Sequence, residues 1–160
     1  MKAISIISII YGVLGLIWGT AIKVLIQVYT SLLGHIELPP EASRFFDAPK
    51  LMGSLSGIWN LLYPFIIMIA IIYIISGIIY LSGKQQYTSL TFIAAILNII
   101  WYVAYMIIVQ TELMPLINTG DLFPVKLFQM MVVIGMLFEA IFYCGYPIFL
   151  VIYLSRTRRR

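Results

Sequence analysis

The stretch GIWNLLYPFIIMIAIIYIISGIIYL, residues 57–81, decides the fold class because it contains no charged side chain. A helix needs about 20 mostly apolar residues to cross the hydrocarbon core of a bilayer. In lipid every backbone donor and acceptor must be satisfied within the protein, which leaves helices or closed barrels. The apolar residues here are continuous rather than alternating, so the stretch predicts a transmembrane helix.

Similar apolar stretches recur along the chain, and the sequence as a whole is strongly hydrophobic. The 160 residues are 62% hydrophobic and 10% charged, whereas soluble domains are about 45–50% apolar and about 25% charged. We therefore expect one all-α domain over residues 1–160, a polytopic membrane protein built as a four-transmembrane-helix bundle in the lipid bilayer. The predicted spans cover about residues 3–33, 57–81, 88–111 and 127–154, joined by outer loops 34–56 and 112–126 and by a short cytoplasmic loop 82–87.

The start of the chain resembles a signal peptide only in having Lys2 before an apolar stretch. That stretch is much longer than the apolar core of about 7–15 residues that signal peptides have. We therefore expect it to be retained as the first span.

Charge placement predicts the orientation of the bundle, since basic residues in short loops favour the cytoplasmic side. With both termini cytoplasmic, that side carries no acid and has six basic residues, against three on the other side. The six are Lys2, Lys84, Arg156, Arg158, Arg159 and Arg160. The sequence therefore predicts cytoplasmic N and C termini, with the four arginines near anionic lipid headgroups. We read the basic excess as a membrane anchor and expect no nucleic-acid partner.

Small residues form a stripe along one face of the first span. Ser8, Gly12, Gly15 and Gly19 follow one another at steps of three or four, and the last two form a G-x-x-x-G pattern. Residues at such steps share a helix face, and small side chains allow close approach of membrane helices. We expect Gly15 and Gly19 to face another helix rather than lipid.

Glu139 is the one acid within VVIGMLFEAIFYCG, residues 132–145, near the middle of the fourth span. An ionisable residue at this depth is costly and points to function. Asn98 lies at a similar depth in the third span, and Tyr102 and Tyr143 are close in sequence to the two polar residues. We expect Glu139 to be buried, protonated and hydrogen-bonded across the bundle. Pairing with Lys23 is the alternative, although Lys23 lies nearer the outer boundary.

The spans lack the side chains that usually form catalytic, metal or cofactor sites. The only histidine is His35 and the only cysteine is Cys144. This excludes haem held by two histidines of the chain and disfavours structural zinc, and Cys144 is expected to be a small packed side chain. No nucleophile and base pair or phosphate-binding loop is evident. We expect no enzyme, no cofactor and no metal site.

Two functions remain open. The first is a non-enzymatic integral membrane subunit that assembles with itself or with a partner membrane protein through the Gly/Ser face or the outer loop around Phe45-Phe46. The second is a small oligomeric channel or a proton- or cation-coupled transporter that uses Glu139. A single small bundle has little room for a pore, which favours the first. Without disulfides or a targeting segment, the bacterial cytoplasmic (inner) membrane is the expected location.

Overall fold

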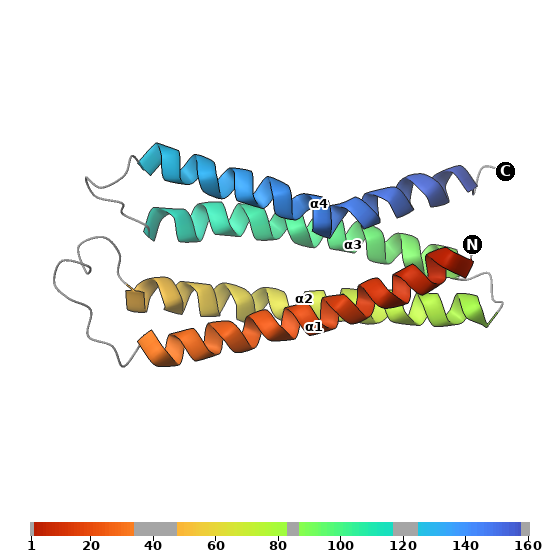
Figure 1. Ribbon diagram of the computed structural model, residues 1–160, viewed down its shortest axis with the longest axis horizontal. Coiled ribbons are helices and arrows are strands. Elements are labelled where there is room, and N and C mark those ends of the chain that lie inside the picture. The colour runs from red at the N-terminus through yellow and green to blue at the C-terminus, as the bar shows by residue number, and fades with distance from the viewer. Residues whose placement is uncertain (1, 34–47, 83–86, 117–124, 158–160) are drawn as a thin grey trace.

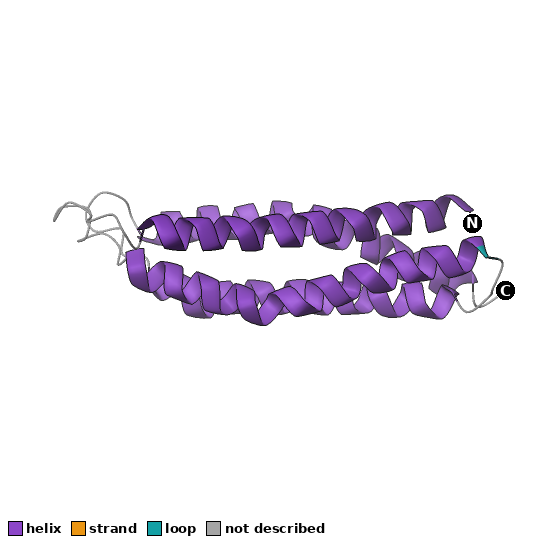
Figure 2. Ribbon diagram, turned by 90° about the horizontal axis from the view of Figure 1, so that it is seen from below, coloured by secondary structure: helices purple, strands orange, loops and turns teal. Residues whose placement is uncertain are grey.

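The computed structural model describes residues 2–33, 48–82, 87–116 and 125–157. They form four long helices, α1 (Lys2–Leu33), α2 (Ala48–Leu81), α3 (Tyr87–Ile108) and α4 (Val125–Thr157). Each of these, α3 together with its continuation, is long and apolar enough to cross a membrane. The helices lie along one common axis, and both termini are at the same end, here called the terminal end (Figures 1 and 2). The all-helical, four-span prediction is confirmed, and the chain is an integral membrane protein.

Two helices extend by more than one turn into segments predicted as loops. α2 begins at Ala48 rather than at residue 57, and α3 continues through a π-helical turn (η2, Val109–Leu113) and a 3-10 turn (η3, Met114–Leu116). Pro49 lies in the first turn of α2, where a missing N–H costs nothing because it would have no helical partner. A proline taken as part of a loop thus marks a helix start.

The helices pack in chain order, α1 on α2, α2 on α3 and α3 on α4. The closest approach is between α1 and α2. A Cβ added at Gly12 would lie 2.6 Å from the Ala70 carbonyl oxygen, and one added at Gly77 would lie 2.8 Å from the Ser5 carbonyl oxygen. Only glycine allows the two backbones to meet this closely.

Gly15 and Gly19 also face α2, towards Ala70 and Ile66. The small-residue stripe therefore packs within the chain. Gly15 and Gly19 thus face another helix of the same chain rather than lipid.

Aromatic side chains pack between the helices. Tyr73, Trp101 and Tyr102 are buried, and the Trp101 indole N–H donates to the Leu62 carbonyl oxygen at 3.1 Å, which joins α3 to α2. Trp101 is thus a packing residue. Cys144 is buried as well, with a free thiol. Large apolar side chains cover the outer surface of all four helices, as lipid contact requires.

Candidate functional site

Asn98 ties three helices together in the interior. Its side chain is 4% exposed, and its Nδ2 donates to the Tyr11 hydroxyl at 3.0 Å and to the Tyr143 carbonyl oxygen at 2.7 Å. The Tyr11 hydroxyl donates to the same carbonyl oxygen at 2.7 Å. This network, made of Tyr11 on α1, Asn98 on α3 and the Tyr143 carbonyl on α4, is the polar clamp of the bundle.

Pro147 explains why the Tyr143 carbonyl is available. In a regular helix that carbonyl would accept from the N–H four residues later, and proline has none. α4 changes direction near its middle (Figure 1), as expected for a helix with a buried internal proline. The freed acceptor is then satisfied by Tyr11 and Asn98. Sequence reasoning missed both Tyr11 and Pro147, although a proline four residues after Tyr143 was the available signal.

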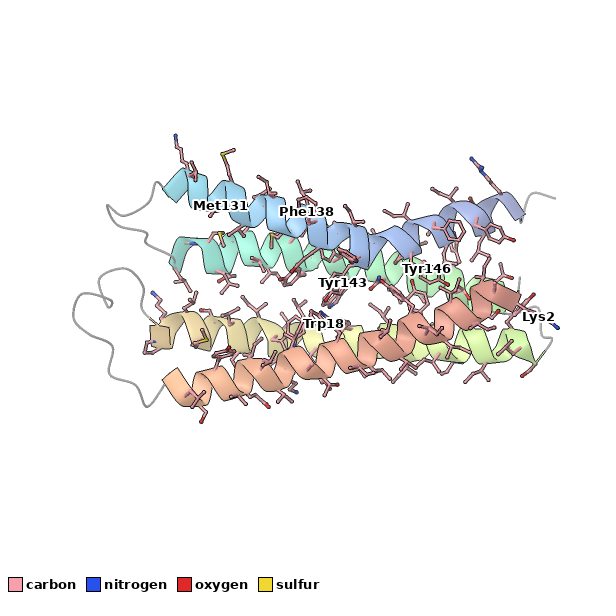
Figure 3. The ribbon with its side chains drawn as sticks, in the orientation of Figure 1. Lys2, Trp18, Met131, Phe138, Tyr143 and Tyr146 are labelled. Carbon is pink, nitrogen blue, oxygen red and sulfur yellow. The ribbon has the colours of Figure 1, made fainter. Side chains whose placement is uncertain are left out.

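A second polar contact joins α1 and α4 closer to the terminal end. The Tyr146 hydroxyl donates to the Ile4 carbonyl oxygen at 3.1 Å and lies 2.8 Å from the Ser8 hydroxyl, within hydrogen-bonding distance. Figure 3 shows Tyr146 between the two helices. Ser8 thus bonds α4, while the glycines of its stripe pack on α2.

The other predicted polar residues have partners of their own. The Tyr102 hydroxyl donates to the Met136 carbonyl oxygen, and its ring stacks on Tyr143 with centroids 5.5 Å apart. The Lys23 ammonium lies 4.2 Å from the centroid of the Tyr63 ring on α2. Lys23 therefore makes a cation–π contact, and it forms no ion pair with Glu139.

Glu139 is placed differently from the prediction. It is exposed on α4, and within the described part of the chain it has no hydrogen bond or ion pair. The predicted bonds from Glu139 to Asn98, Tyr102 or Tyr143 are not made, so the prediction of a buried, bonded carboxyl is corrected. The physical reason is that Pro147 leaves the Tyr143 carbonyl oxygen without a helical donor. The Asn98 amide donates to that oxygen rather than to the Glu139 carboxyl.

Glu139 borders a cleft of about 620 Å³ that all four helices line. The exposed residues of its lining are Leu14, Ile17 and Trp18 on α1 and Glu139 and Phe142 on α4, so its mouth lies between these two helices. Trp18 and Tyr143 lie in the space between these helices, which diverge towards the end away from the termini (Figures 1 and 3). α1 and α4 are thus joined by the clamp and by Tyr146, and they leave an opening on the lipid-facing side beside Glu139.

The back of the cleft holds one unsatisfied polar group. Tyr73 lines it from α2 and is completely buried, yet its hydroxyl has no hydrogen-bond partner among the described residues. The Tyr11 ring meets it edge-on with centroids 5.1 Å apart. A buried hydroxyl without a partner is unusual in native proteins.

The remaining predicted features lie at the ends of the bundle. Arg156 is exposed in the last turn of α4, and residues 158–160 and the Phe45-Phe46 segment lie outside the described residues. Over the described ranges no group of three or more histidine, cysteine or acidic side chains is arranged to hold a metal ion.

In comparisons with known proteins, no family model matches the chain, and neither a curated protein nor a solved structure shows significant similarity.

Proposed function

We propose that the protein is a non-enzymatic integral membrane subunit that associates laterally with a second transmembrane surface, from another copy or from a partner protein. The observation that carries the proposal is Glu139, an acid near the middle of a span, exposed and without a partner in the described chain. Placing a charge there costs at least ~2.5–3.5 kcal/mol on insertion scales. A second protein surface that covers Glu139 and offers a polar group reduces this cost.

The surface around Glu139 suits such contact. Phe142 is 78% exposed, and Phe138 on α4 and Trp18 on α1 are also exposed. Aromatic side chains are enriched where proteins associate. We call this surface, made of Trp18, Phe138, Glu139 and Phe142, the open face. It replaces the Gly/Ser stripe as the assembly surface.

The Glu139→Leu variant tests assembly through the open face. Native mass spectrometry after extraction in mild detergent should show wild-type complexes heavier than one 18.2 kDa chain, and Glu139→Leu should shift the population to single chains. The fold should tolerate the change because Glu139 makes no bond within the described chain.

The matched control is Glu112→Leu, which removes an exposed acid near the end of α3. It should leave the complex intact. Wild-type protein found only as single chains, or an unchanged mass for Glu139→Leu, would contradict assembly through the open face.

The second candidate is an oligomeric channel or a proton- or cation-coupled transporter. It is favoured by one observation, that Glu139 lies at the mouth of the cleft rather than on a featureless apolar surface. Under this function Glu139→Gln abolishes ion or proton flux into liposomes and leaves the complex mass unchanged. Assembly without flux supports the subunit instead.

We further propose that both termini face the cytoplasm of a bacterial inner membrane, with the C-terminal arginines against anionic headgroups. The support is the basic asymmetry of the sequence and the location of both termini at one end of the bundle (Figure 1). In a Cys144→Ala background, a cysteine introduced at Ser43 should react with an impermeant maleimide added outside intact cells. Reaction only from the cytoplasmic side would reverse the topology.

A further inference from the structure

We propose that the cleft beside Glu139 binds a lipophilic organic cation taken laterally from the bilayer, with its charge at Glu139 and its apolar body against Trp18, Phe142 and Tyr143. This goes beyond lateral assembly, because the cleft is formed by one chain, so a single chain would bind the cation, and a second surface on the open face would compete with it for Glu139. Ligand sites are concave, mostly apolar spaces with a few polar groups that fix orientation.

The size and position of the cleft suit a small molecule. Its volume of about 620 Å³ falls within the range of about 300–1,000 Å³ typical of ligand pockets. Side chains from all four helices line it, from Trp18 on α1 and Ile66 on α2 to Asn98 on α3 and Phe142 on α4. The mouth lies within the apolar spans, so a guest dissolved in lipid reaches it without crossing water.

The charge of the cleft selects a cation. Glu139 is the only charged residue among those that line it. Lys23 does not neutralise it, since its ammonium lies over the Tyr63 ring at 4.2 Å. A cation that binds beside Glu139 favours the ionised form of the carboxyl by pairing with it, whereas an anion would be repelled and a neutral lipid tail would leave the carboxyl unpaired.

Aromatic rings strengthen this selection. Tyr11, Trp18, Tyr73, Phe142 and Tyr143 all line the cleft, and the faces of such rings attract cations, most strongly where water is excluded. The unpartnered Tyr73 hydroxyl is a further sign that the space is incomplete without a guest, because buried polar groups normally have a partner. An acid among aromatic rings in an apolar space is therefore best matched by a cation with an apolar body.

Tetraphenylphosphonium is the probe, and tetraphenylborate is its control of the same shape and opposite charge. Purified protein is placed in nanodiscs of zwitterionic phosphatidylcholine, and saturable binding is measured by equilibrium dialysis against empty nanodiscs. We expect saturable binding of the phosphonium and none of the borate. Glu139→Gln should weaken binding by about tenfold or more, which corresponds to about 1.4 kcal/mol.

Two further variants locate the site. Trp18→Leu keeps the charge and removes one ring, so it should weaken binding by about two- to fivefold. Glu112→Gln removes an acid that does not line the cleft and should leave binding unchanged. The native mass of every variant is recorded in parallel, so a failure to assemble is seen separately from a failure to bind.

The inference is overturned by any of three results. The first is phosphonium uptake no greater than that of empty nanodiscs. The second is equal binding of the borate, which would show that the cleft is only apolar. The third is equal affinity of the wild type and Glu139→Gln. Binding by protein that stays as single chains would support the inference and would contradict only the assembly proposal.

Discussion

Replacing Gly12 with leucine is expected to force α1 away from α2 and to destabilise the bundle by about 3 kcal/mol or more, at or beyond the upper end of the usual cost of overpacking. The first added carbon would lie 2.6 Å from the Ala70 carbonyl oxygen and 2.8 Å from Cγ1 of Ile74. The carbonyl belongs to the α2 backbone and cannot rotate aside as a side chain would. Unfolding by sodium dodecyl sulfate in mild detergent measures the loss.

Leucine substitutions at three other glycines should lower the stability of the bundle by smaller amounts, which allows a comparison with Gly12→Leu. Gly19→Leu should cost less, because its added carbon meets only side-chain atoms, the nearest being Cγ2 of Ile66 at 3.2 Å. Gly15→Leu should cost less again, with Ala70 Cβ at 3.4 Å. Gly135→Leu on α4 is the matched control, since nothing lies within 4 Å of its added carbon. Equal stabilities for the Gly12 and Gly135 variants would show that α1 and α2 do not meet as described.

Replacing Asn98 with leucine is expected to cost about 1–3 kcal/mol, because single hydrogen bonds between membrane helices average about 0.6 and reach about 1.7 kcal/mol. The change removes the two bonds from Nδ2 to Tyr11 and Tyr143. The Tyr11 hydroxyl still donates to the Tyr143 carbonyl, so the clamp is weakened rather than lost. The same unfolding titration measures the difference.

Asn60→Leu is the control for the Asn98 variant. Asn60 is exposed on α2, so exchanging it for leucine should leave the stability of the bundle nearly unchanged. The Asn98→Leu, Tyr11→Phe double variant should cost less than the sum of the two single changes, because the residues share one network. Strict additivity, or an Asn98 variant as stable as the Asn60 variant, would show that the clamp does not hold α1, α3 and α4 together.

The spans could be predicted from the sequence because backbone N–H and C=O groups in lipid must be hydrogen-bonded within the protein. A long, continuous apolar segment can meet this requirement only as a helix. The pattern of one helix also shows which residues share a face, as for Gly15 and Gly19. It does not show which neighbour that face meets. The sequence leaves the glycine stripe open to packing within the bundle and to assembly between chains, and in the structure it packs on Ala70 and Ile66 of the same chain.

The interior network illustrates a second limit. The sequence indicates that Asn98 is an interior polar residue and predicts that its partner is Glu139, the titratable side chain nearest to it in depth. The actual acceptor is a backbone carbonyl on Tyr143 that Pro147 leaves without its helical donor. The pattern of side chains does not show which backbone carbonyls lack a helical donor. Such a carbonyl is found only by looking four residues before each proline in a helix. Once that acceptor is counted, Glu139 has no partner among the described residues of the interior and lies at the open face.

Photo-crosslinking from the open face tests most directly whether Glu139 and its neighbours meet a second protein surface. p-Benzoylphenylalanine is incorporated at Phe142 on α4 or, as the control, at Ile100, which is exposed on α3. After illumination of intact membranes we predict covalent adducts with another protein chain from position 142 and adducts with lipid alone from position 100. Lipid adducts alone from both positions, or protein adducts of equal yield from both, would contradict lateral association through the open face.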